Sequence, residues 1–574
     1  MIQKISFQNY KAFEKGEIKL KPITILLGAN SVGKSSIINL LSMLQQTANS
    51  TNYRSALRLH GENVSMGECR NIFRNKKTSN NIVVAFEFNS KSLKELLKER
   101  SFSIFINQIF RQIQFISRFP EKIKHPIDDE FNQFIKTGKI DKKLYNSKQA
   151  FQKLIVAIET INKSMLENKK LKKVEQPNLS RYSLRYNENF ILNNKKILEL
   201  IYDFFVEAKK INEDLFNLSF ELCSVTSNKE DVLKIRNVSL MNNEKEILNI
   251  KFTLDQSKIK CKKINITSDF TNRQELLDNK AKDEFLKLID FDSTIFSWVY
   301  NNKNRDFYFR SLYNDEYSIV TKTLIQIIEQ VIDEARWQFD KRFINHVSPL
   351  RAHPKRYYFL DKANIRTALD SLDGDSLTEI LKENVIVKNK VNTWLKTFGL
   401  QVEVDPLQDI VHKLKIKQYT LDLDITDVGF GISQILPIIV QGFLSSDNSL
   451  TMIEQPEIHL HPKMQAELAD LFIDIAGIAI KNKDKLSIPK KHLLIETHSE
   501  YLLRRLRRRI SEGEISAQDV AIYFIVPPKN ENSSAEIQEK KVSENGFFEW
   551  PQDFYAKELI EDTTEFLKQS IRKK

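Results

Sequence analysis

The hydrophobic pattern changes its period several times along the chain, and each change predicts a different kind of element. Residues 2–8 and 16–27 are rich in apolar and β-branched side chains, which predicts two strands joined by a turn at 10–15. Apolar residues then recur at helical spacing over 37–44, so we expect a helix that packs onto a sheet. Another apolar run predicts a strand at 82–89.

Residues 90–215 are mostly helical in pattern and carry 25 Lys and Arg against 16 Asp and Glu. Their apolar heptads end too soon to form a long coiled-coil arm, so the segment is predicted to be an inserted helical subdomain. Two interpretations of its charge stay open. It is either a surface that contacts DNA, RNA or a partner protein, or a solvated face around a small helical core.

Between residues 218 and 266 the hydrophobic period becomes two. The alternating runs lie at 218–225, 232–240, 247–254 and 258–266, with polar turns between them. Alternate side chains then face a buried and a wet side, which is typical of an antiparallel meander. Helical spacing returns after the meander and is clearest at 323–339.

The stretch ITILLGANSVGKSS, residues 23–36, is an apolar strand, then a glycine-bearing loop, then a helix that begins near Lys34. Residues 28–35 match the P-loop pattern G-x-x-x-x-G-K-[ST]. Gly28 and Gly33 allow backbone angles that turn successive N–H groups toward a polyphosphate, and the helix N-terminus adds partial positive charge. The predicted nucleotide contacts in this loop are Gly28, Asn30, Gly33, Lys34, Ser35 and Ser36.

Two apolar strands in the last third end in polar groups that suit the same chemistry. The run SLTMIEQPEIHLHP, residues 449–462, has the form of a Walker B strand, and Glu454 at its end is predicted to hold Mg²⁺ together with Ser35. The run KHLLIETHSE, residues 491–500, is predicted to be another buried strand that ends at His498.

A candidate signature helix precedes the Walker B strand by some twenty residues, in ITDVGFGISQILPIIV, residues 425–440. Gly429 and Gly431 free the backbone there, and Ser433 and Gln434 lie near a helix start. By their resemblance to the signature helix of ABC-type ATPases, these residues would face a γ-phosphate bound on a second subunit.

The strings GANSVGKSS, DVGFGISQILPI, EQPEIHLHPK and ETHSEYLLRRLRRRI, in this order, resemble the OLD-like, ABC-type AAA ATPases of bacteria. That group includes the ATPase subunits of Septu-type antiphage systems and retron-linked ATPases. The two N-terminal strands before the P-loop resemble RecF and SMC heads. The resemblance covers residues 1–88 and 216–574 and implies ATP and Mg²⁺ as cofactors, a switch histidine at His498, and a head dimer that sandwiches ATP.

The resemblance implies an α/β fold, an ABC-type (RecF/SMC-like) P-loop ATPase head with an antiparallel β-subdomain and an inserted helical subdomain. The expected segments are the N-terminal part of the head with the P-loop at 1–88, the basic helical insertion at 89–215, the β-meander and helical part of the head at 216–345, and the C-terminal part with the signature, Walker B and switch histidine at 346–574.

The chain departs from this family pattern in two places. Gln455 follows the metal-binding acid, where ABC ATPases usually carry a glutamate that orients the attacking water. An amide can position water but cannot take its proton, so turnover is expected to be slow unless Glu457 takes that role. The signature is not LSGGQ, and either Gly429 or Ser433 stands at its serine position.

Three other features carry open alternatives. The loop at 347–358, with Arg351, Lys355 and Arg356, is either an anion contact or an ordinary surface loop. The pair His459 and His461 invites a metal interpretation, but it falls in the expected D-loop without an obvious third ligand, so we favour a structural role.

The arginine run at 504–509 either contacts DNA or forms the wet side of an amphipathic helix, and we favour the wet side. The apolar face of that helix would consist of Leu502, Leu503, Leu506 and Ile510.

Composition adds the cellular setting. The net charge of +13 and the pI of about 9.2 favour polyanions, although AT-rich coding also inflates lysine. The three cysteines, Cys69, Cys223 and Cys261, have no metal-ligand or disulfide spacing. With no signal peptide and no long apolar run, we expect a cytoplasmic protein that makes no membrane contact.

These features predict an ATPase that acts as the sensor, regulatory or scaffold subunit of an antiphage defence complex. The sequence shows no Toprim cluster and no HNH grouping, so its effector, expected to be a nuclease, would be a separate polypeptide. One alternative is a RecF/SMC-like DNA repair ATPase that binds DNA. Another is a non-hydrolysing scaffold held closed by ATP.

Overall fold

A computed structural model describes residues 1–50, 54–117, 147–156, 195–227, 230–255, 260–299, 317–359, 374–408, 410–478, 491–530, 533–550, 564–565 and 568. The chain forms two compact units. The first comprises Met1–Asn49, Arg58–Phe86 and Gln338–Lys574, and the second comprises Ser50–Leu57 and Glu87–Trp337.

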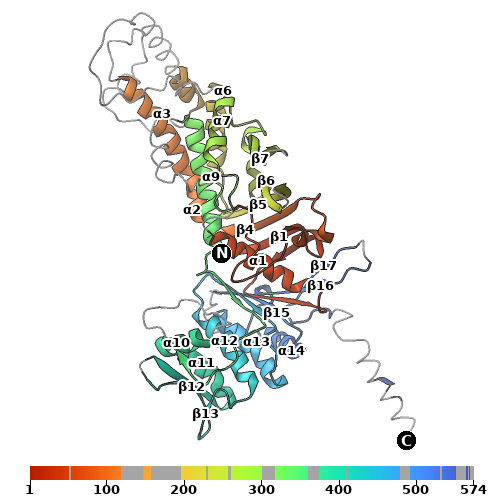
Figure 1. Cartoon of the computed structure of the whole chain (residues 1–574). Helices are drawn as coiled ribbons and strands as arrows, with labels where there is room; N and C mark the ends of the chain where they lie inside the picture. The colour runs from red at the N-terminus through yellow and green to blue at the C-terminus, as the bar shows by residue number, and fades with distance from the viewer. Residues whose placement is uncertain are drawn as a thin grey trace, which may run out of the picture. The chain divides into compact units, whose positions relative to one another are not determined.

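A six-stranded sheet forms the centre of the first unit (Figure 1). Its order is β17 (Glu536–Lys540), β16 (Val520–Val526), β3 (Ile23–Gly28), β15 (His492–Glu496), β14 (Leu450–Glu454) and β9 (Ile344–Val347). All neighbours are parallel except β16 and β17. Parallel strands end at one edge, so β3, β15 and β14 bring their carboxyl ends together.

The predicted strand at 16–27 is corrected by the structure, because it is two strands in different sheets. β2 (Phe13–Lys19) pairs antiparallel with β1 (Ile2–Tyr10), whereas β3 lies in the six-stranded sheet. Pro22, which lacks an N–H, lies between them, and Oγ1 of Thr24 bonds both the N–H and the carbonyl of Lys21. This local turn redirects the chain at a point that the apolar pattern over 16–27 does not mark.

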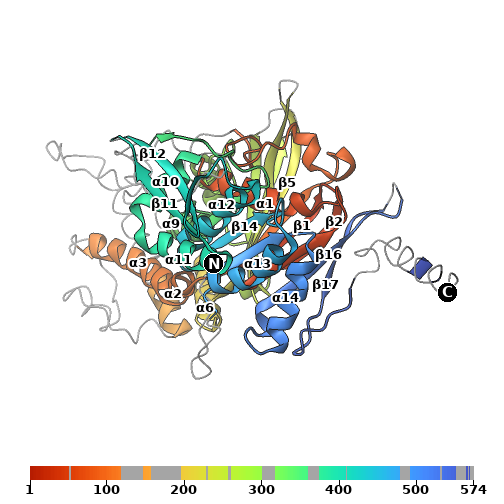
Figure 2. The same ribbon diagram turned by 90° about the horizontal axis from the view of Figure 1, so that it is seen from below.

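Helices pack on the sheet through their apolar faces. The predicted helix after the P-loop is α1 (Lys34–Ala48), and the candidate signature helix is α12 (Phe430–Leu444). The pair α13 (Pro462–Ile475) and α14 (Glu500–Ser511) lie side by side in both views (Figure 2). The predicted apolar residues of α14, Leu502, Leu503, Leu506 and Ile510, are all buried.

A smaller layer of the first unit is built from two helices and four short strands. The helices are α10 (Gly374–Glu383) and α11 (Val385–Leu395). The strands are β10 (Tyr358–Phe359), β11 (Leu400–Pro406), β12 (Val411–Gln418) and β13 (Leu421–Asp424), all joined in antiparallel pairs. Both α10 and α11 contact α12, so this layer supports the helix that begins at Gly429.

The second unit confirms the predicted antiparallel meander. Its four strands are β5 (Leu215–Ser227), β6 (Glu230–Asn242), β7 (Lys245–Asp255) and β8 (Lys260–Thr267), each paired with the next. The boundary between the two units falls within β4 (Ile82–Asn89), the strand predicted at 82–89.

The described residues of the second unit also form several helices. They include α2 (Lys91–Glu95), α3 (Ser101–Ser117), α6 (Lys195–Ala208), α7 (Asn279–Leu288) and α9 (Ile319–Gln338). In the described part of the insertion, the rings of Phe151 and Tyr202 stack with centroids 4.4 Å apart, and Phe105 contacts Phe151 and Phe205. The rest of the predicted helical insertion, at 118–146 and 157–194, lies outside the described residues.

The parallel six-stranded sheet with its helices and the separate antiparallel meander confirm the predicted α/β fold with an antiparallel β-subdomain. The division of the chain into four segments stays a prediction. Among the residues that the structure describes, no helix combines the length and apolar character needed to cross a membrane.

Candidate nucleotide-binding site

The loop between β3 and α1 has the geometry of a phosphate cradle. Gly28 has φ 146° and Gly33 has φ 113°, both in the region that favours glycine. A Cβ at Gly28 would lie 2.7 Å from the carbonyl oxygen of Ile525, and one at Gly33 would lie 2.9 Å from the ring of Phe13. Side chains are therefore excluded at both positions. The first turn of α1 carries no acidic residue, so the field of its N-terminus is available to an anion.

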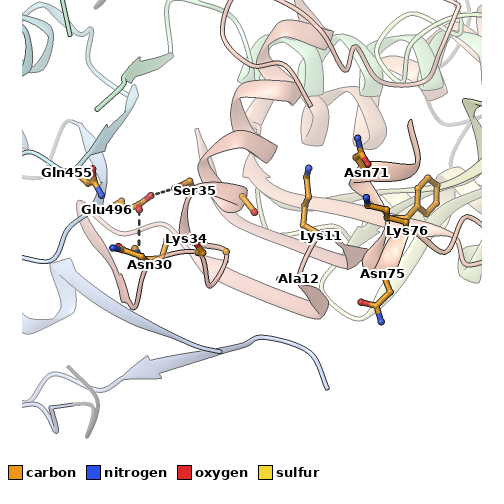
Figure 3. A pocket seen from close by; sticks show the side chains of 14 residues that line it. Lys11, Ala12, Asn30, Lys34, Ser35, Asn71, Asn75, Lys76, Gln455 and Glu496 are labelled. Atoms are coloured by element: carbon orange, nitrogen blue, oxygen red, sulfur yellow. Dashed lines mark hydrogen bonds and ion pairs between the residues drawn. The ribbon is translucent and has the colours of Figure 1, made fainter. Parts of the chain in front are cut away.

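This loop opens on a cavity of about 500 Å³ (Figure 3). Its lining comes from the P-loop, from the turn between β1 and β2, from residues 71–76, and from the ends of β14 and β15. The lining residues are Lys11, Ala12, Asn30, Ser31, Gly33, Lys34, Ser35, Ser36, Asn71, Phe73, Asn75, Lys76, Gln455 and Glu496. Lys11, Asn71, Asn75 and Lys76 lie on the side away from Glu496, so the cavity extends beyond the loop.

Lys34 and Ser35 are both engaged by protein groups. The Lys34 ammonium donates hydrogen bonds to the carbonyls of Gly28 at 3.1 Å and Ala29 at 2.7 Å, and it lies 3.7 Å from the Glu496 carboxylate. The Ser35 hydroxyl donates to the same carboxylate at 2.9 Å. Burial lowers the pKa of Lys34, and Glu496 opposes that shift. A phosphate would have to replace these contacts.

Glu496 is a site residue that the sequence analysis missed, because the strand was expected to end at His498. β15 ends at Glu496, which is 3% exposed and lies directly opposite Glu454 in the parallel pairing with β14. Burial, and then the negative charge of Glu454, raise the pKa of Glu496. The available signal was an acidic residue at the end of an apolar strand, the same signal that identified Glu454.

Glu454, the predicted magnesium ligand, is in contact with a histidine from the neighbouring strand. Its Oε1 lies 2.8 Å from Nε2 of His346 in β9. The structure therefore places Ser35 against Glu496, while Glu454 contacts His346. The hydroxyl and the two carboxylates are hard oxygen donors of the kind that Mg²⁺ prefers, so these residues fit the ion. Which carboxylate binds it stays a prediction.

Gln455 and Glu457 occupy the turn after β14. Gln455 lines the cavity beside Glu496, and its N–H donates to the Glu496 carbonyl at 2.8 Å (Figure 3). The Glu457 carboxylate accepts hydrogen bonds from Oγ1 of Thr497 at 2.8 Å and from the N–H of His498 at 2.6 Å. Burial raises the pKa of Glu457. The three predicted catalytic residues, Gln455, Glu457 and His498, therefore lie together just after the ends of the neighbouring strands β14 and β15.

His498 lies close enough to the P-loop for the charge of Lys34 to act on its imidazole. Partial desolvation, and then the positive charge of Lys34, lower the pKa of His498. Both effects favour the neutral imidazole, which has one ring nitrogen that donates a hydrogen bond and one that accepts.

The signature residues lie at the start of α12 and do not line this cavity. Gly429 is the exposed N-cap, and a Cβ added there would meet nothing within 4 Å. A Cβ at Gly431 would lie 2.6 Å from the carbonyl oxygen of His459, so α12 packs tightly on the turn that carries His459. Ser433 and Gln434 are buried, which leaves Gly429 as the open position at this helix end.

The remaining cationic and histidine motifs have partners of their own. His461 caps α13 by accepting a hydrogen bond from the Lys463 N–H. Arg504 pairs with Glu500, Arg505 with Glu467, Arg508 with Glu512, and Arg509 with Asp470, while Arg507 lies over the rings of Phe547, Phe548 and Trp550. Each arginine of the run is thus tied to an acid or an aromatic ring, as the wet-side interpretation expects.

A P-loop cradle next to the carboxylates at the ends of two parallel strands defines a P-loop nucleotide-binding protein. The family model described as an AAA ATPase domain matches residues 1–503, and the chain belongs to this family. Among solved structures, the chain is similar to the SMC head domain from Thermotoga maritima, with a TM-score of 0.33 and 6% identity, over 94% of this chain and 98% of that chain. A comparison with curated protein sequences gave no match.

Proposed function

We propose that this chain binds ATP with Mg²⁺ at the P-loop and hydrolyses it to ADP and phosphate. The observation that carries the proposal is the convergence of Lys34, Ser35 and Gln455 on Glu496 at the wall of one cavity. The P-loop glycines and the N-terminus of α1 would hold the phosphates. Once Lys34 leaves the loop carbonyls, it would contact the β- and γ-phosphates.

The metal site would draw on side chains of three neighbouring elements. Ser35, Glu454 and Glu496 are the candidate oxygen ligands, supplied by α1, β14 and β15. Bound Mg²⁺ would neutralise charge on the phosphate oxygens during transfer.

Gln455 and Glu457 would act on the attacking water in two different ways. The Gln455 amide faces the cavity and would orient the water, but it cannot accept a proton. Glu457 would accept that proton while the bond between the γ-phosphorus and the bridging oxygen breaks. The raised pKa of Glu457 favours acceptance of the proton, and the ring N–H of the neutral His498 beside it could donate a hydrogen bond to a γ-phosphate oxygen.

The functional assembly we propose is a dimer of heads with ATP between them. The exposed start of α12 at Gly429 supports this, since open space there would admit the phosphate of a nucleotide bound on the second subunit. Slow hydrolysis, expected with Gln455 at the usual glutamate position, would make the closed dimer long-lived. The dimer would then act as a timer.

The cellular role we propose is the regulatory subunit of an antiphage defence complex whose effector, a nuclease, is another polypeptide. This rests on the resemblance carried by the four motif strings. A DNA repair ATPase is the second candidate and a non-hydrolysing scaffold the third. Purification of the tagged chain from its native host separates the first two, because a nuclease in fixed ratio supports the defence complex.

The test is phosphate release from Mg²⁺–ATP by the wild type and by Glu457→Gln, with ATP affinity measured in parallel. The exposed Glu383→Gln serves as the control, since among the described residues its carboxylate lies near the neighbouring Lys382, 3.7 Å away. We expect Glu457→Gln to lose turnover by roughly 100-fold while it keeps its affinity. If the wild type binds ATP and releases no phosphate, the scaffold alternative holds. If it binds no ATP, the proposed function is wrong.

A further inference from the structure

Arg351 lies in the 347–358 loop, and the structure separates it from the surface residues around it. Its side chain is 5% exposed, whereas that of the preceding Leu350 is 77% exposed. β9 pairs with β14 up to the contact of Val347 with Ile453, so the loop leaves the sheet beside the end of the Walker B strand. Nη2 of Arg351 donates hydrogen bonds to the carbonyls of Glu454 at 2.7 Å and Gln455 at 3.3 Å.

The rest of this guanidinium has no hydrogen-bond partner within the part of the chain that the structure describes. Nε and Nη1 are both buried and unpaired. A buried cation with unmet donors costs free energy, and an apolar side chain of similar length would fill this space at lower cost. Stability alone therefore does not account for an arginine here.

The turn that Arg351 holds is strained. Gln455 has φ 43°, a left-handed conformation that a side chain makes unfavourable. Hydrogen bonds fix this backbone from the two neighbouring strands. The Gln455 N–H donates to the carbonyl of Glu496 at the end of β15. The Arg351 guanidinium, in the loop after β9, donates to the carbonyls of Glu454 and Gln455. The strained conformation directs the Gln455 amide into the nucleotide cavity.

We propose that Arg351 is a positioning residue for hydrolysis: it holds the turn after the Walker B strand so that the Gln455 amide faces the attacking water. This role rests on the proposed function. Burial lowers the pKa of Arg351 to about 10, while the carboxylates of Glu457 and Glu454 act favourably on its positive charge. Arg351 thus acts through Gln455 and does not contact the nucleotide.

The test compares Arg351→Met, which keeps the length of the side chain without its donors, with Arg351→Lys, which keeps one charged donor group. Arg356→Met is the matched control, because this arginine of the same loop is 65% exposed and lies 3.7 Å from Asp427. We expect Arg351→Met to lower kcat between about 10- and 100-fold with ATP affinity retained. Arg351→Lys should recover part of the lost kcat, and the Arg356→Met control should match the wild type.

Two further measurements distinguish positioning from a general loss of structure. In a double-mutant cycle, Arg351→Met should add little to Gln455→Ala, because both remove the same oriented amide. Hydrogen exchange should rise in the peptide that spans 454–458 and stay unchanged in α1. Fully additive effects on kcat, or unchanged exchange in that peptide, would overturn the proposal.

The outcomes also separate this inference from the proposed function. If the wild type hydrolyses ATP and Arg351→Met does so equally well, the positioning role is wrong and the ATPase assignment stands. If the wild type releases no phosphate, the ATPase assignment is wrong. Hydrogen exchange then decides by itself whether Arg351 holds the turn.

Discussion

Two arginine-bearing regions of the first unit look very different in sequence and in structure. α14 carries five arginines between residues 504 and 509, each with an acidic or aromatic partner close by. Arg351 stands in a loop of modest charge, but it is buried at a strand end, and two of its nitrogens have no hydrogen-bond partner among the described residues. The density of charge along a sequence is therefore a poor guide to function. The partners that a charge finds, or lacks, are more informative.

The largest effect should come from the phosphate site. Lys34→Met removes the ammonium that would contact the β- and γ-phosphates, and we expect ATP affinity to fall roughly 100-fold, on the order of 3 kcal/mol, because those charged contacts are lost. Fluorescent ATP titration measures this. Lys210→Met, an exposed lysine paired with Glu207, is the control and should bind as the wild type does. Equal losses in both variants would contradict the site.

A smaller but specific effect is expected at Glu496. The change Glu496→Gln keeps an acceptor for the Ser35 hydroxyl but removes the negative charge beside Lys34. We expect turnover to fall roughly tenfold to 100-fold and the Mg²⁺ concentration needed for half-maximal turnover to rise. Phosphate release measured across a Mg²⁺ series tests both. If the Mg²⁺ concentration for half-maximal turnover does not change, Glu496 does not bind the metal.

On the other side of the comparison, Arg509 should affect stability alone. Its guanidinium makes hydrogen bonds to both carboxylate oxygens of Asp470, at 2.5 and 3.1 Å, and is 21% exposed. Arg509→Ala should therefore lower the free energy of unfolding by about 1–2 kcal/mol. Urea denaturation measures the loss, and ATP affinity should not change. A turnover defect in a stable Arg509→Ala protein would break the contrast between the two regions.

The smallest effect is expected at Arg508. This side chain is 62% exposed and pairs with Glu512 one turn along the helix. Arg508→Ala should change stability by no more than about 0.5 kcal/mol and should leave affinity for a DNA duplex unchanged. If α14 were a DNA-binding surface, Arg508→Ala would remove one phosphate contact. The slope of the logarithm of the binding constant against the logarithm of salt concentration would then become less steep by about one. A salt titration of both proteins with a short duplex gives the answer.

Local patterns in the sequence predicted much of this fold. The P-loop between β3 and α1, the four-stranded meander and the apolar face of α14 all follow from spacing within a few residues. The split of the predicted strand at 16–27 was missed, because the turn depends on Thr24 closing on Lys21 rather than on hydropathy.

The site was predictable only where a motif is continuous in the chain. Ser35 and Glu496 lie 461 residues apart, so no window of sequence shows that they touch. The role inferred for Arg351 likewise depends on two carbonyls more than a hundred residues away. Burial and unmet donors are properties of the folded chain, and the alternatives left open for the 347–358 loop could not be decided without them.

The order of strands in the six-stranded sheet also has a consequence for synthesis on the ribosome. β3 is made among the first 28 residues, but its neighbours in the sheet, β15 and β16, begin at His492 and Val520. At typical elongation rates, the interval between Ser35 and Glu496 lasts roughly 20–90 s. For that time an apolar strand has emerged without either partner. We therefore expect the yield of soluble protein to depend on chaperones that bind nascent chains. The yield should rise when such chaperones are present throughout translation.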